Sequence, residues 1–275
     1  MEYLLALLVG GVLTFNAVVT PNKAEDAIQS TLQKQFPAAT VNVDIKGKRG
    51  RDVLRGRFKT LDVSMQNIAV QEGGAPAFAI SAVPDAKNKG RLGQSTIELR
   101  DIMWDGAIID TIEIKVTNLV YDFKALKEEN ALRIVSSGPV SARIVLPAAS
   151  VEKMVAGGLK SVQEAKLTLR DDRVTLRGKT PLPIIKSLAA FTLTSKLEAR
   201  NRNELWLIEP RLVLDQATGL ALPAGPLLAG INPLLVVDKE KQWPYSVNIT
   251  RVLVRNDKLE IGAELTFIPA KIVKK

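Results

Sequence analysis

The chain has 275 residues, of which 46% are hydrophobic, and a formal net charge of +9. This length and composition allow one large domain or two ordinary ones with a sizeable core, and they exclude a disordered chain. The sequence contains no cysteine and no histidine, which excludes disulfides, thiolate or imidazole metal sites, and serine–histidine or cysteine nucleophiles. The positive charge favours anionic partners such as phosphates, nucleic acid or acidic lipid head groups.

Residues 3–19 carry no charge and are rich in leucine, valine, alanine and glycine. That length is at the short end for a membrane-spanning helix. A cleaved signal peptide begins with basic residues and ends at a small-x-small site, whereas Glu2 is the only charge before this run. We therefore expect residues 1–21 to anchor the protein in the membrane on the periplasmic or extracytoplasmic side; secretion after signal cleavage is the alternative.

A short amphipathic helix is predicted from Asn22 to Pro37, followed by a strand at 41–45. Next, residues 46–59, KGKRGRDVLRGRFK, contain seven basic residues, one acid and three glycines. This run is either a solvated hairpin loop or a loop that contacts anionic lipid head groups. Nucleic acid is not expected, because Phe58 is the only aromatic residue available for stacking. The head-group interpretation assigns binding to Lys46, Lys48, Arg49, Arg51, Arg55 and Arg57.

Two segments share an interrupted apolar alternation, FKTLDVSMQNIAV at 58–70 and IDTIEIKVTNLVYDF at 109–123. Apolar residues alternate, skip two positions and resume, and looser forms of the pattern occur at 205–214 and 247–254. Skipping two positions keeps the apolar side chains on one face only if a residue is inserted as a bulge. Because bulges add twist and bend, these strands predict a strongly curved sheet whose apolar concave face forms a trough.

Hairpins are predicted to turn at Asp105-Gly106, Asp171-Asp172 and Asn256-Asp257, which are favoured turn residues. Residues 132–146 read as one strand, and a short helix is expected to follow Pro147 and to end at Gly157-Gly158. The fold class that follows is α+β and mostly β.

Residues 216–237, QATGLALPAGPLLAGINPLLVV, form a stretch of 22 residues without charge. Three prolines and three glycines argue against a regular membrane-spanning helix. We expect one or two short apolar helical turns that plug an end of the trough or, alternatively, dip into a bilayer surface. Residues 269–275 are expected to form a basic tail.

Carboxylates offer little chemistry in this sequence. Asp101, Asp105 and Asp110 are the only local cluster, and they lie at a predicted hairpin end. Adjacent acids such as Asp171 and Asp172 fit a turn better than a metal site, because their side chains diverge. We therefore expect no catalytic residue, no metal, no cofactor and no enzymatic activity.

The order of these segments resembles the LmeA-like phospholipid-binding family of bacterial envelope proteins. The resemblance covers about residues 24–268, so the lipid-binding domain is placed at 22–268. It implies a fold similar to tubular (TULIP-like) lipid-binding proteins, a curved antiparallel sheet wrapped round one or more helices with an apolar groove for acyl chains. The segments that carry the resemblance are FKTLDVSMQNIAV, IEIKVTNLVYDF, ARIVLPAASVEKMV, LTLRDDRVTLRG and VLVRNDKLEIGAEL.

The predicted function is that of a phospholipid-binding or lipid-transfer protein of the bacterial cell envelope, with anionic phospholipids and the membrane as partners. A non-catalytic envelope scaffold whose trough is filled by its own side chains is the alternative. Acyl chains are expected to contact the apolar residues Val116, Leu193, Leu197, Leu227, Leu228, Ile231 and Leu265.

Overall fold

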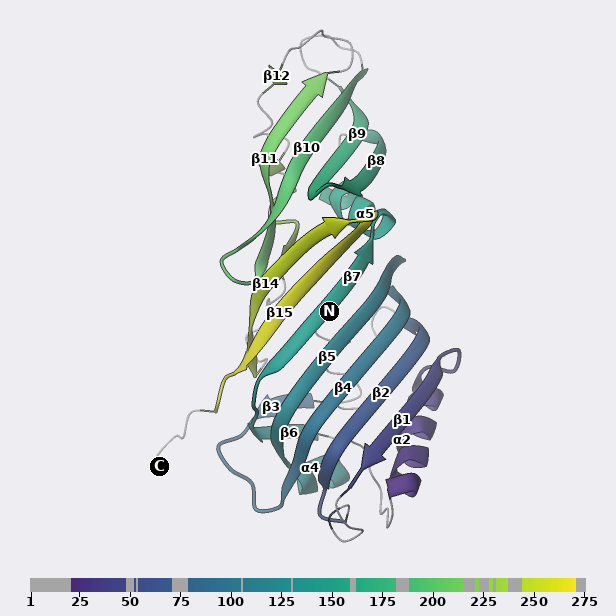
Figure 1. Ribbon diagram of the computed structural model, residues 1–275, viewed down its shortest axis with the longest axis vertical. Helices are drawn as coiled ribbons and strands as arrows, with labels where there is room; N and C mark the ends of the chain where they lie inside the picture. The colour runs from purple at the N-terminus through teal and green to yellow at the C-terminus, as the bar shows by residue number, and fades with distance from the viewer. Residues whose placement is uncertain are drawn as a thin grey trace.

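The structure is a computed structural model, and it shows an elongated molecule in which two β-sheets follow one another along the long axis (Figure 1). All of the predicted N-terminal anchor except its last residue, and most of the basic tail, lie outside the residues that it describes. The described residues are 21–47, 52, 54–70, 79–104, 106–129, 131–158, 162–181, 188–214, 221–222, 228–229, 231–236 and 244–270.

The larger sheet has nine strands within the described residues, in the order β1-β2-β4-β5-β7-β15-β14, with β6 also pairing with β5 and β3 pairing with β6. All its neighbouring strands are antiparallel except β2 with β4 and β3 with β6, which are parallel. Its strands are β1 (Thr40–Lys46), β2 (Arg57–Val70), β3 (Ala79–Ala82), β4 (Lys89–Trp104), β5 (Ala107–Asp122), β6 (Ala131–Ser136), β7 (Val140–Pro147), β14 (Tyr245–Arg255) and β15 (Lys258–Phe267).

The smaller sheet has six described strands, and all its pairings are antiparallel. It curves into a half-barrel, which confirms the predicted strongly curved antiparallel sheet for this part of the molecule (Figure 1). Its strands are β8 (Gln163–Arg170), β9 (Arg173–Pro181), β10 (Leu188–Arg200), β11 (Glu204–Leu214), β12 (Ala221–Leu222) and β13 (Leu235–Val236).

At Asn67 and Asn118 the interruptions are not the inserted residues that were predicted, because the register with β4 is the same on both sides of each. Asn67 and Asn118 lie in the skipped positions and have positive φ values of 60° and 49°, a conformation that asparagine tolerates better than most residues. Opposite Asn67, Asp101 also leaves the pairing with φ 52°, so the register continues unchanged beyond the two residues. Register shifts at 194/196 and 249/251 account for the looser patterns.

Three helices lie within the described residues: α2 (Pro21–Gln35), α4 (Phe123–Glu129) and α5 (Ala148–Gly158). Helix α2 packs on β1 through Ile28 and Leu32, which are fully buried. Helix α4 packs on β6, and α5 lies where the two sheets meet, in contact with β8, β5, β7 and β15 (Figure 1). The predicted helices before Pro37 and after Pro147 are confirmed.

Hydrogen bonds between hairpin turns join the two sheets. The amide of Asp172, in the β8–β9 turn, donates to the carbonyl of Val254 at 3.2 Å. In return, the amide of Asp257, in the β14–β15 turn, donates to the carbonyl of Leu169 at 3.1 Å. Both acids have positive φ, so the predicted turns at Asp171-Asp172 and Asn256-Asp257 are confirmed and also form the junction.

Two predictions about strands are wrong. Residues 132–146 form two strands rather than one, because the chain bends at Gly138 and Pro139, which exchange hydrogen bonds with Thr117. The basic segment 46–59 is not a loop throughout: β2 begins at Arg57, so its last three residues lie on a strand.

One face of the larger sheet is apolar across its whole width. A single row of register partners crosses seven strands, and every member is buried, with 2–6% of its surface exposed. Ser95 is the one polar residue in this row, and its hydroxyl donates to the carbonyl of Leu61 at 2.7 Å. The row is Ile45, Leu61, Ser95, Val116, Val140, Leu265 and Val247.

Candidate functional site

The candidate site begins at the turn before β2, where Gly56 has φ +64°. A Cβ atom at this position would lie 2.3 Å from Cδ2 of Phe123, so both the backbone conformation and the packing require glycine. The Gly56 carbonyl accepts two hydrogen bonds, from the amide of Arg91 at 2.8 Å and from the hydroxyl of Tyr121 at 3.0 Å. These contacts fix the start of β2 beside the start of β4.

This anchoring makes Arg57 and Arg91 register partners on the parallel strands β2 and β4. Their side chains are exposed, whereas the next residues in each strand, Phe58 and Leu92, are buried. The two strands lie close together two residues further on: a Cβ at Gly93 would lie only 2.7 Å from the carbonyl oxygen of Lys59. Two exposed arginines therefore occupy paired positions on neighbouring strands at one end of the larger sheet.

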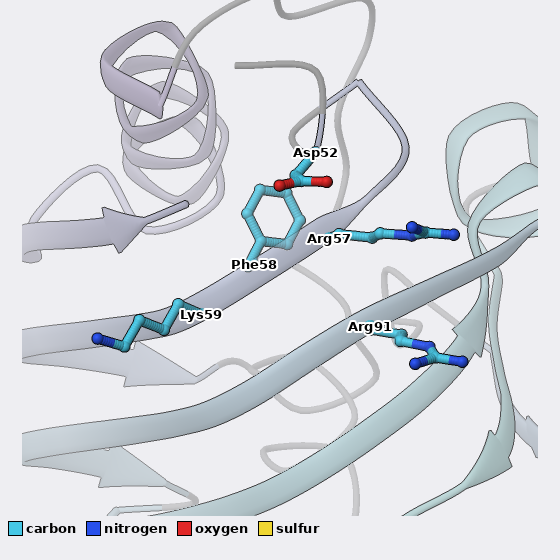
Figure 2. A pocket seen from close by; sticks show the side chains of 5 residues that line it. All are labelled: Asp52, Arg57, Phe58, Lys59 and Arg91. Carbon is cyan, nitrogen blue, oxygen red and sulfur yellow. The ribbon is translucent and has the colours of Figure 1, made fainter. Parts of the chain in front are cut away.

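A pocket of about 260 Å³ opens at this end of the sheet. Figure 2 shows the side chains of Arg57 and Arg91 extending in the same direction from neighbouring strands, and Lys59 extending the other way. Asp52 also lines the pocket, and Phe58, which belongs to the hydrophobic core, forms its apolar wall.

The electrostatics of the pocket are predominantly positive, with three cations and one carboxylate. Arg57, Lys59 and Arg91 form no ion pair with any carboxylate in the described part of the chain. Uncompensated like charges on neighbouring strands disfavour the folded state. The pocket can therefore bind an anion through charge-assisted hydrogen bonds that are not already made within the described protein.

The structure brings only part of the predicted head-group set to this pocket. Arg57 lines it, and Arg55 is exposed in the adjoining turn. Lys46 instead pairs with Asp44 at 3.0 Å, and hydrogen bonding to that carboxylate raises the pKa of the lysine. The predicted residues Lys48, Arg49 and Arg51 lie outside the described residues.

Sequence reasoning missed Arg91 and did not single out Lys59. Lys59 lies within the basic segment, but Arg91 comes from another strand, and its proximity depends on the parallel pairing of β2 with β4. A signal was present: Gly56-Arg57-Phe58 and Gly90-Arg91-Leu92 open the two strands with the same pattern. At Gly90 a Cβ would lie 2.5 Å from the ring of Tyr121, so this glycine too is needed for packing.

The residues predicted to contact acyl chains divide between the two sheets. Val116 and Leu265 flank Val140 on the apolar face of the larger sheet. Leu193 is buried and Leu197 partly buried in the smaller sheet. Leu228 and Ile231 are also buried, and Leu227 lies outside the described residues.

The segment around Ile231 is tied to β11 by the Asn232 side chain. Its amide oxygen accepts from the Leu207 amide and its amide nitrogen donates to the Leu207 carbonyl, both at 2.9 Å. Where it is described, the predicted plug is therefore packed into the core rather than projecting from it. A helical turn is present at 228–229, as expected, and the amides of Ile231 and Asn232 donate to the carbonyl of Leu228. The short pieces β12 and β13 are strands, which were not expected.

The acidic residues singled out in the sequence have structural partners. The carboxylate of Asp101 accepts a hydrogen bond from Gln66 at 2.8 Å, and that of Asp110 pairs with Lys258 at 2.8 Å. Asp105 lies outside the described residues. Within the described ranges, no group of three or more acids could hold a metal ion.

None of the helices in the described part of the chain is both long and apolar enough to cross a membrane. The chain is a mostly β protein with a strongly curved smaller sheet, and its larger sheet has an apolar face and a cationic pocket at one end. It belongs to the LmeA-like phospholipid-binding family, whose model matches residues 17–264. No curated protein matches the chain.

Proposed function

We propose that this protein binds phospholipids without acting on them chemically, and that their acyl chains lie against the apolar face of the larger sheet. Membership of a phospholipid-binding family supports this function. Burial of each methylene group contributes about 0.8 kcal/mol, so an acyl chain along this face would be held without any specific polar contact.

One feature of the apolar face carries the proposal. In the row next to Val140, the register partners Ala142 and Ala263 are only half-buried, although they lie between Ile114 and Ile249, which are buried. Two small side chains side by side are thus less covered than their neighbours in the row. A half-buried apolar spot on an otherwise buried face is a suitable contact for a hydrocarbon chain.

The proposal places the protein in the bacterial cell envelope, where it transfers phospholipid or stores it. Residues 1–21 would hold it at the membrane, or would direct its export if they are cleaved. The uncharged run at 3–19 supports this location, and the net charge of +9 supports a preference for anionic lipids. The helices and the two curved sheets would together enclose the acyl-chain groove.

A structural role without lipid is the second candidate. It is favoured by the low exposure of the predicted acyl-chain residues, since Val116 and Leu265 are each 6% exposed and Leu193 is 2% exposed. In this case the interior would be filled by the protein's own side chains.

Uptake of lipid distinguishes the two candidates. The full chain is purified, stripped of lipid, and mixed with a phospholipid that carries a fluorophore on its acyl chain. Phospholipid binding predicts saturable uptake that unlabelled phospholipid displaces, and a scaffold predicts none. Movement of the label from donor to acceptor vesicles then tests transfer separately from binding.

A further inference from the structure

We propose that Arg57 and Arg91 form the binding site for the phosphate of an anionic phospholipid, with Lys59 contributing to its positive field. This inference rests on the proposed phospholipid binding and adds a head-group site to it. It differs from the basic loop expected from the sequence, because its main pair lies on strands and one partner, Arg91, is distant in the sequence.

The position of the two arginines is the first argument. They are direct register partners with exposed side chains, and neither has an ion-pair partner within the described residues. Like charges placed side by side cost stability unless an anion neutralises them. Several other exposed cations in the same sheet pair with acids, as Lys115 does with Glu113 at 2.6 Å.

The chemistry of the pocket is the second argument. Planar guanidinium groups bind phosphate oxygens through paired N–H donors, and two of them extend in the same direction here (Figure 2). The buried ring of Phe58 provides an apolar wall next to these charges. A phospholipid has the same arrangement, with a charged phosphate joined to an apolar body.

The adjoining turn indicates how a lipid in a membrane would reach the pocket. Leu54 is 50% exposed, two residues from Asp52 and next to the exposed Arg55. A large apolar side chain beside several cations suits the surface of an anionic bilayer, where the apolar group enters the acyl region and the cations stay at the phosphates. A free phosphate ion would need no such residue.

The test measures lipid preference and lipid uptake together. Full-length protein stripped of lipid is offered vesicles of phosphatidylglycerol or of phosphatidylcholine, and the bound lipid is quantified. Wild type is expected to prefer phosphatidylglycerol, and Arg57→Gln or Arg91→Gln should reduce that preference about tenfold. Arg177→Gln is the matched control, because Arg177 is exposed on the smaller sheet with no ion pair in the described residues.

A second arm distinguishes a lipid head group from a free anion. Leu54→Ser is tested for binding of vesicles and for binding of inorganic phosphate. Ile268→Ser is its control, because Ile268 is equally exposed and lies outside the pocket. A lipid site predicts that Leu54→Ser weakens vesicle binding severalfold and leaves phosphate binding unchanged. Asp52→Asn should strengthen phosphate binding a few-fold, because it removes the one carboxylate of the pocket.

The outcomes separate this inference from the function on which it rests. If wild type takes up both lipids equally and the arginine variants match Arg177→Gln, the phosphate site is wrong while phospholipid binding stands. If wild type takes up neither lipid, the function itself is wrong. Tight phosphate binding with no effect of Leu54→Ser on vesicles would identify the site as one for a free anion and overturn the lipid assignment.

Discussion

The hydroxyl of Tyr121 donates a hydrogen bond to the carbonyl of Gly56 at 3.0 Å, and so joins β5 to the turn that opens β2. Tyr121 is completely buried, and this bond satisfies the only polar atom of its side chain. The same carbonyl accepts the amide of Arg91. One backbone oxygen therefore connects three strands of the larger sheet at the cationic pocket.

Removal of this hydroxyl tests the connection. Tyr121→Phe is expected to lower the free energy of unfolding by about 1 kcal/mol, the usual net contribution of a hydrogen bond, and to weaken phosphate binding by loosening the turn. Urea unfolding and titration with phosphate measure the two effects. Unchanged values for both would show that the bond neither stabilises the fold nor positions the pocket.

The pH dependence of stability follows from the same residue. Burial raises the pKa of Tyr121 above the ordinary tyrosine value of 10.0, so the folded protein keeps the proton where the unfolded chain releases it. The stabilisation is complete below pH 10 and is lost as the pH rises above that value. Between pH 9 and 11, roughly one unit on either side of the ordinary tyrosine pKa, wild type should therefore lose more stability than Tyr121→Phe. Urea unfolding at several pH values in this range measures the difference.

Two glycines with positive φ provide a matched test of the turn. Gly56 faces the ring of Phe123, whereas the nearest atom to a Cβ at Gly106 would be Nζ of Lys153, at the end of a flexible side chain. Gly56→Ala should cost about 1–3 kcal/mol more than Gly106→Ala, because a packed ring cannot move aside. Equal costs in thermal or urea unfolding would mean that φ alone determines both effects.

Much of the β architecture follows from local pattern. The interrupted alternation predicts bulges, and the structure has register shifts in the looser patterns at 205–214 and 247–254. At Asn67 and Asn118 the residues have positive φ, but the partner strand skips a residue too and the register does not shift. Asp171-Asp172 and Asn256-Asp257 predict turns, because Asp and Asn side chains bond to the nearby backbone and tolerate positive φ. These features depend on a few neighbouring residues, so they can be read from the sequence.

The pocket could not be predicted in this way, because it depends on contacts between distant segments. A run of cations suggests a continuous loop, and nothing in residues 46–59 indicates that Arg91 lies beside Arg57. That pairing requires β2 and β4 to be parallel, which depends on how the chain between them returns to the same end of the sheet. The separation into two sheets also rests on long-range pairing rather than on local pattern.

Repulsion within the pocket should be measurable without any ligand. Arg91→Gln is expected to raise the free energy of unfolding by a few tenths of a kcal/mol at low ionic strength, because it removes one of two neighbouring like charges. The gain should shrink in 0.3 M salt, where the Debye length is about 5–6 Å. A loss of stability at low salt would instead indicate that Arg91 already has a stabilising partner.

The half-buried alanines of the apolar face offer a direct test of acyl-chain binding. Ala142→Phe places a ring on the apolar face where acyl chains are proposed to lie, and should reduce uptake of fluorescent phospholipid at least severalfold. Ser141→Phe is the control, since Ser141 is the preceding residue of β7 and is exposed on the opposite face. Circular dichroism would establish that both variants fold. Equal uptake by the two variants would exclude this part of the face from lipid binding.

Native mass spectrometry of the full chain, purified by gentle extraction, tests the central claim most directly. Phospholipid binding predicts complexes whose added mass equals one or more whole phospholipids, with the same lipids present in an organic extract of the sample. A protein that is free of lipid after such extraction, and that takes up no added phospholipid, would contradict the claim.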